Sequence, residues 1–72
     1  MAEEVLTETP GNVWKVLVKP GDQVDAGATL FIMEVMKTEV PHNAAGAGTV
    51  RAVHITEGQE GVDAGIVAVE ID

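Results

Sequence analysis

The 72-residue chain is strongly acidic, with twelve acidic residues against four basic ones and a net charge of -8. A chain this short has room for one small core and none for a multi-substrate active site, which argues against an independent enzyme. Its negative charge repels phosphate backbones and anionic lipids, so nucleic acid and membrane surfaces are poor partners. A hydrophobic content of 46% is typical of a globular domain.

Cysteine is absent from the sequence. This excludes disulfides, Cys-ligated zinc, iron–sulfur clusters and thiol catalysis, so stability must come from packing. The N-terminal segment Met1–Glu4 has no basic region and no apolar span follows it, so we expect neither a signal peptide nor a membrane anchor. We expect a single cytoplasmic domain over residues 1–72 that is monomeric when isolated.

Valine-rich segments alternate with clusters of Gly, Pro, Asn and Asp, a pattern that favours short strands over helices. Many short strands with regular turns predict an all-β sandwich or flattened barrel. In chain order we expect strands at 4–7, 12–18, 23–24, 29–36, 38–42, 49–55, 61–62 and 66–71.

An internal repeat divides the chain. The pattern Gly-x-Val occurs at 11–13 and again at 48–50, and Val-Asp-Ala-Gly at 24–27 recurs at 62–65. Two similar halves indicate pseudo-two-fold symmetry, in which each half buries a face against the other. The expected half-repeats span about 11–36 and 48–71.

The second half carries one extra residue between Gly58 and Val62. One extra residue in a strand reverses the face of every later side chain unless a bulge absorbs it. Gly61 is the residue best suited to absorb it, because glycine accepts backbone angles that other residues avoid.

The centre of the chain predicts a β-hairpin with Met36-Lys37 at its tip, since no Pro or Gly interrupts the segment until Pro41. Two-residue hairpin turns require positive φ, which Met and Lys adopt unfavourably. A locally unfavourable turn indicates a functional position. Alternation places Leu30, Ile32 and Val40 inward, and Glu34 and Glu39 outward on either side of Lys37.

The segment Glu34-Val35-Met36-Lys37-Thr38 is centred between the two Gly-x-Val motifs, and Pro20-Gly21-Asp22-x-Val24 precedes it. These motifs resemble the biotinyl/lipoyl attachment domain, and more narrowly the biotin carboxyl carrier domain of biotin-dependent carboxylases. The resemblance covers roughly residues 4–71. It implies a flattened barrel-sandwich hybrid of two four-stranded antiparallel sheets. No insertion separates Val13 from Gly21, so it implies a carrier without the protruding thumb of some relatives.

The resemblance implies that Lys37 is the covalent attachment site for biotin, through an amide to its amine. It further implies that a biotin protein ligase modifies this lysine. The biotin would act as a swinging arm that receives a carboxyl group from a biotin carboxylase, which uses ATP and bicarbonate. The arm would carry this group to a carboxyltransferase acting on an acyl-CoA or similar acceptor. The chain would then be a non-catalytic carrier. Ligase or carboxylase recognition falls on Glu34, Val35, Met36 and Thr38, although the family often has Ala or Ser at the position of Val35 and Met or Leu at that of Thr38.

Three alternatives stand beside this reading. Lipoate could replace biotin, although the lipoyl branch typically has Asp where this chain has Met36. The fold could serve as an unmodified adaptor, because a fold does not dictate a function. Lys37 could also be an ordinary solvated lysine paired with neighbouring acids.

The remaining candidate residues are interpreted as structural. His42 and His54 have no Cys partners and no close spacing, so we expect surface or edge positions and no metal site. Trp14 is expected to cover one edge of the core rather than to contact a partner. Lys15 and Lys19, the other two lysines, are expected to face solvent in a strand or turn.

Overall fold

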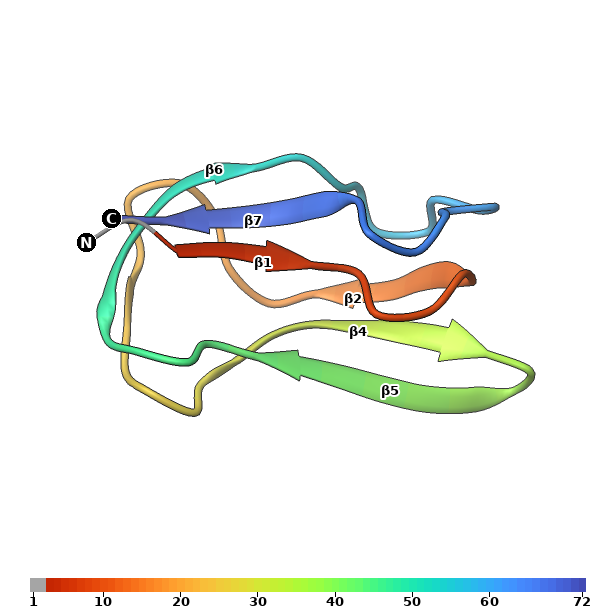
Figure 1. The fold of residues 1–72 in the computed structure, drawn as a ribbon. Coiled ribbons are helices and arrows are strands. Elements are labelled where there is room, and N and C mark those ends of the chain that lie inside the picture. Colours follow the sequence, from red (N-terminus) through yellow and green to blue (C-terminus); the bar gives the residue numbers. More distant parts are fainter. Residues whose placement is uncertain (1–2) are drawn as a thin grey trace.

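A computed structural model describes residues 3–72, and Met1-Ala2 of the N-terminal segment interpreted above lie outside them. The described residues contain strands and turns and no helix, in two antiparallel sheets of order β1-β7-β6-β3 and β2-β4-β5. The β4–β5 hairpin projects at one end, and the start of β1 and the end of β7 lie at the other (Figure 1). The strands are β1 (Glu3–Leu6), β2 (Asn12–Val16), β3 (Gln23–Val24), β4 (Thr29–Val35), β5 (Thr38–Asn43), β6 (Gly48–Val53) and β7 (Val67–Ile71).

The predicted all-β fold with two antiparallel sheets is confirmed, with one difference in strand count. The expected strand at 61–62 is reduced to a single bridge between Gly11 and Val62. Gly61 has a φ of 66°, which turns the chain out of the extended conformation immediately before Val62. The second sheet therefore has three strands and one bridge in place of four strands.

Backbone hydrogen bonds are exchanged between the two halves in matching pairs. The N–H of Gly21 donates to the carbonyl of Val50 at 2.8 Å, and the N–H of Gly58 donates to the carbonyl of Val13 at 2.9 Å. Gly21 and Gly58 have φ of 96° and 87°, a left-handed conformation that favours glycine. Each half thus satisfies buried backbone groups of the other, as the sequence repeat predicts.

A second matching pair secures the Val-Asp-Ala-Gly turns. The N–H of Gly27 donates to the carbonyl of Ala44, and that of Gly65 donates to the carbonyl of Thr7, each at 2.7 Å. The two turns are therefore equivalent in space although they are separated by one residue more than the preceding motifs. The extra residue is accommodated before the second turn, where Gly61 adopts its positive φ.

Both halves also contain a β-bulge at the same place. The pairing of β2 with β4 shifts register between Val13 and Lys15, and that of β6 with β7 shifts between Val50 and Ala52. A bulge opposes two residues of one strand to one residue of its partner. Trp14, between Val13 and Lys15, is consequently exposed, with the Lys15 amine 5.6 Å from its ring centroid. The expectation that Trp14 covers the core was wrong.

The core is formed by thirteen apolar side chains from both sheets, and it departs from strict alternation along β4. Leu30 is buried as predicted, but Phe31 and Met33 are buried as well, whereas Ile32 is only half-buried. The reason is a register shift between Thr29 and Phe31, which turns two consecutive side chains inward. Val40, also predicted inward, is half-buried and packs against the core. The core residues are Val5, Val13, Val24, Leu30, Phe31, Met33, Ala44, Val50, Ile55, Val62, Ala68, Val69 and Ile71.

His42 is part of this interior, so its expected surface position was wrong. It is 3% exposed and stacks on Phe31, its cross-strand partner, with ring centroids 4.4 Å apart. Its Nε2 accepts a hydrogen bond from the N–H of Glu8, and its Nδ1 lies 3.2 Å from the carbonyl of Val40. These two partners suit a neutral imidazole with the proton on Nδ1.

His54 is exposed, as expected, and belongs to a charged cluster on the outer face of the four-stranded sheet. Glu70 contacts both His54 and Arg51, and the Arg51 Nη1 lies 3.5 Å from a carboxylate oxygen of Asp72. Hydrogen bonds from His54 and then Arg51 lower the pKa of Glu70. The same contact with Glu70 raises the pKa of Arg51.

The lowered pKa of Glu70 predicts a pH-dependent contribution to stability. A carboxyl group with a depressed folded-state pKa stabilises the fold above its ordinary value, here 4.5, and this stabilisation is lost as the pH falls through the folded-state pKa. Glu70→Gln should therefore be less stable than the wild type at pH 6, and the difference should shrink well below pH 4.5. Urea unfolding at several pH values measures this. The exposed Glu60→Gln is the control, and an identical pH profile for both variants would contradict the prediction.

Candidate functional site

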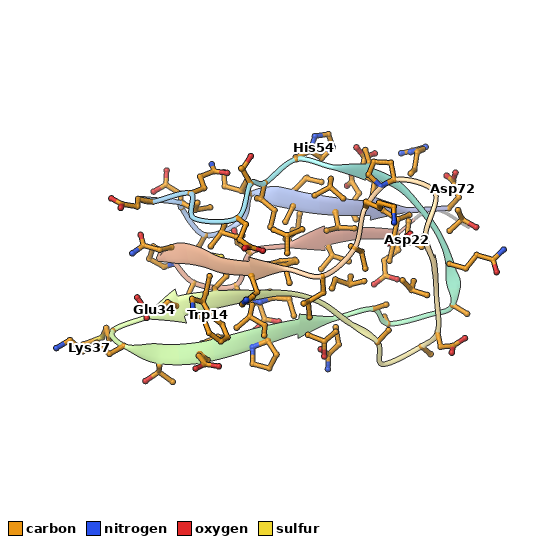
Figure 2. All side chains as sticks on the ribbon, turned by 180° about the vertical axis from the view of Figure 1, so that it is seen from behind. Trp14, Asp22, Glu34, Lys37, His54 and Asp72 are labelled. Atoms are coloured by element: carbon orange, nitrogen blue, oxygen red, sulfur yellow. The ribbon has the colours of Figure 1, made fainter. Side chains whose placement is uncertain are left out.

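The tip of the β4–β5 hairpin is a two-residue turn. Val35 and Thr38 form the last cross-strand pair, which leaves Met36 and Lys37 between them. Their φ angles are 50° and 65°, so both central residues are left-handed, as in a type I′ turn. The Lys37 side chain points away from the body at the end of the hairpin (Figure 2). The predicted hairpin tip is confirmed.

This turn is conformationally costly. A left-handed backbone costs an L-residue other than glycine roughly 1–2 kcal/mol. The Met36 side chain is 94% exposed, so it gains almost no packing in compensation. Asn or Gly would suit both positions better. Stability therefore does not explain Met and Lys at the tip.

The backbone below the turn is held tightly by Gly11. A Cβ atom at Gly11 would lie 2.6 Å from the carbonyl oxygen of Glu34 and 3.0 Å from a methyl group of Val35. Val35 is half-buried and packs against the core. The hairpin is thus fixed to the body as far as Val35, and the turn projects from a rigid base. The Gly-x-Val repeat marked position 11, but its contact with the hairpin depends on the fold.

The charges around the turn are acidic. Glu34 and Glu39 are directly opposite each other across the two strands, and both are exposed. Like charges at such a pair are unfavourable. The ion pairs found within residues 3–72 do not include Lys37, whose amine is exposed. An exposed amine on a long stem is accessible to an enzyme that acts on it.

The five residues singled out by the sequence occupy this hairpin end. Met36, Lys37 and Thr38 are exposed, Glu34 lies on the outer face, and Val35 is half-buried. Within residues 3–72, no group of three His, Cys, Asp or Glu side chains is arranged to hold a metal ion. That part of the chain also contains no helix long and apolar enough to cross a membrane.

Comparison with known proteins agrees with this geometry. The model of the family described as "Biotin-requiring enzyme" matches residues 1–71. The chain belongs to this biotin/lipoyl attachment family. The biotin/lipoyl attachment protein of Bacillus subtilis (strain 168) is 42% identical over 67 residues, which are 93% of this chain and 90% of that protein. The family resemblance inferred from the sequence is confirmed.

Two further relatives of this family member are larger proteins. The biotin carboxyl carrier protein of Streptococcus mutans is 48% identical over 50 residues, covering 69% of this chain and 38% of that protein. The crystal structure of the Kluyveromyces lactis urea carboxylase superposes with a TM-score of 0.90 at 35% identity, covering 100% of this chain and 6% of the carboxylase. The fold thus corresponds to a small part of a much larger carboxylase.

The left-handed turn predicts that its residues can be replaced to gain stability. Met36→Asn combined with Lys37→Gly should raise the free energy of unfolding by about 1–2 kcal/mol, because both new residues tolerate positive φ. Urea unfolding measures the gain, and Met36→Asn alone should give part of it. A double variant no more stable than the wild type would show that the turn is not strained.

The close contact at Gly11 predicts a specific cost of adding a methyl group there. Gly11→Ala should lower the free energy of unfolding by about 1–3 kcal/mol, because the carbonyl of Glu34 must move away from the added methyl group. Gly46→Ala is a matched control, since no atom lies within 4 Å of a Cβ built at Gly46 and its φ is not left-handed. Thermal unfolding of the two variants compares them, and equal losses would contradict the proposed role of Gly11.

Proposed function

We propose that the chain is a biotin carboxyl carrier domain and that Lys37 is the residue to which biotin is attached. The observation that carries the proposal is a single exposed lysine at the apex of a strained turn, on a rigid base, in a member of the biotin/lipoyl attachment family. A carrier needs such an amine outside the body, where another enzyme can enclose it.

The attachment chemistry belongs to a biotin protein ligase. A lysine amine is protonated at neutral pH and is a poor nucleophile, so the ligase must take the proton and supply an activated acyl adenylate. The amine nitrogen of Lys37 then forms an amide bond with the carboxyl carbon of biotin, and AMP leaves. The carrier contributes the position of the amine and no catalytic side chain.

The shape of the domain suits a carrier. Its extents are 32 × 18 × 17 Å, and the acceptor turn lies at one end of the elongated body (Figure 1). An enzyme pocket can therefore enclose the turn while the rest of the domain stays outside. Biotin attached there would carry a carboxyl group from a biotin carboxylase to a carboxyltransferase. Tethering gives each transfer a high effective concentration.

The proposal includes the setting in which the carrier works. We propose that it is non-catalytic, monomeric when isolated, and cytoplasmic, where ATP is available to the ligase and the carboxylase. Glu34, Val35, Met36 and Thr38 are proposed to be recognised by the ligase or the carboxylase, with Val35 contributing chiefly through the backbone because its side chain is half-buried. The acceptor of the carboxyl group is left open.

Intact mass spectrometry tests the proposal directly. The chain is co-expressed with a biotin protein ligase and, separately, with a lipoate ligase. We expect a mass gain of one biotin amide with the first enzyme, and its loss in Lys37→Arg. Lys19→Arg is the control that should still be modified. Lys19 is also exposed, but it lies in another turn, where its Nζ is 3.5 Å from a carboxylate oxygen of Asp22. Lipoylation, or no modification by an active ligase, would contradict the proposal.

A further inference from the structure

The two halves differ sharply at equivalent outward-facing positions. The repeat aligns Trp14 with Arg51 and Leu17 with His54, 37 residues apart, while after the extra residue Ile32 aligns with Glu70, 38 residues apart. The hydrogen bonds support this alignment, because the N–H of Leu17 donates to the carbonyl of Leu30 and the N–H of His54 donates to that of Ala68. The same backbone thus holds three apolar residues in one half and three polar, titratable ones in the other.

In the second half the side chains at these positions pair with one another. Glu70 contacts both Arg51 and His54, and Arg51 also pairs with Asp72. By the same geometry, Ile32 lies beside Trp14 and Leu17 on the outer face of the three-stranded sheet. Its cross-strand neighbours are the exposed Pro41 on β5 and the exposed Lys15 on β2, whose amine lies 5.6 Å from the Trp14 ring centroid. We name Trp14, Leu17, Ile32 and Pro41 the apolar patch. Trp14 is 42% exposed and Leu17 is 51% exposed.

The fold does not require this patch to be apolar. Arginine, histidine and glutamate occupy the equivalent positions without any change in the bulge or in the strand pairing. An exposed Trp is unfavourable in water and is the residue type most enriched at binding hot spots. The second half therefore shows that the fold does not need apolar side chains at these positions. Their apolar character in the first half needs another explanation.

The position of the patch identifies its occupant. Trp14 directly follows Val13, which pairs with Met33, and Met33 is only about 7 Å along the strand from Val35 at the base of the turn. Trp14 and Glu34 lie toward the hairpin end that carries Lys37, whereas Asp72 is at the opposite end (Figure 2). An enzyme that encloses the bare Lys37 amine has no long arm to span a gap, so it must contact the surface beside the turn.

We infer that the apolar patch is the docking surface for the biotin protein ligase, with Trp14 as its central anchor. This inference rests on the proposed function. A two-residue turn is far smaller than the roughly 800 Å² per partner of a standard interface, so the contact must extend onto a sheet face. The charged cluster faces away on the other sheet, whereas the patch adjoins the turn. Glu34 and Glu39 at its edge call for a basic rim on the ligase.

A second copy of the chain is the competing occupant. The exposed part of Trp14 is on the order of 100 Å², and four such residues make a surface well below that of a stable dimer. Two copies would also bring together domains that each carry a net charge of -8. A ligase with a basic rim avoids the charge repulsion, and because it must also enclose the turn, its contact area extends beyond the patch.

Steady-state kinetics with a ligase that biotinylates the wild-type chain tests the inference. Trp14→Arg combined with Leu17→His installs two of the three residues of the second half at exposed positions, so the variant should fold. We expect its KM as a carrier substrate to rise about tenfold while kcat is unchanged, because docking and not chemistry is lost. Trp14→Phe should restore most of the affinity. Arg51→Ala, in the equivalent cluster, should leave KM unchanged.

A second measurement needs no turnover and no folded double variant. Trp14 is the only tryptophan, so its indole N–H gives one NMR signal, which should shift when the ligase is titrated into the Lys37→Arg chain. An unmoved indole signal with a saturating ligase would overturn the inference, as would an unchanged KM in folded Trp14→Arg. Sedimentation showing a wild-type dimer that Trp14→Arg dissociates would assign the patch to self-association instead. If the ligase does not modify the wild type at all, the proposed function itself fails.

Discussion

The structure depends on backbone hydrogen bonds that each half of the chain accepts from the other. Gly21 and Gly58 reach across the pseudo-two-fold axis with left-handed backbones, and neither half can satisfy its own turn alone. A chain of 72 residues without cysteine has little apolar area with which to offset the entropy of folding. Reciprocal pairing gives it a cooperative unit in which loss of one contact weakens the other half as well. The rigidity of the hairpin base follows from this arrangement.

That rigidity allows the turn to keep residues that are poor for its conformation. Met36 and Lys37 both adopt positive φ, and the cost is tolerated because β4 and β5 are already registered by six cross-strand pairs and by the close approach of Gly11. Local strain of this kind persists where the surrounding structure over-determines it, commonly at functional positions. The body of the domain therefore supplies stability, and the turn is free to supply chemistry.

Local sequence patterns predicted the hairpin and its turn, because each depends on neighbouring residues, and the repeat was visible as recurrence of short motifs 37 to 38 residues apart. They failed for Ile32, since alternation assumes an uninterrupted ladder and a register shift near Phe31 breaks it. His42 was misplaced for another reason: it was assigned to the surface as a histidine without metal partners, although alternation from Val40 places it inward. A bulge is decided by how two distant strands pair, which no local window contains. Trp14 was misplaced for the same reason. The repeat could have corrected this prediction, because it aligns Trp14 with Arg51, and an arginine at the equivalent position indicates that the position is exposed.

The two ends of the elongated domain are related by the pseudo-two-fold symmetry. The pseudo-two-fold axis relates the β4–β5 hairpin to the pair formed by β7 and β1, in which Ile71 is opposite Glu3. Within residues 3–72, no turn joins β7 to β1 there. A short linker joining Asp72 to the N-terminal strand would rebuild an equivalent turn, and the chain could then be opened elsewhere. The two ends of the domain are thus equivalent by the pseudo-two-fold symmetry, and a lysine placed in a turn between β7 and β1 would point away from Lys37.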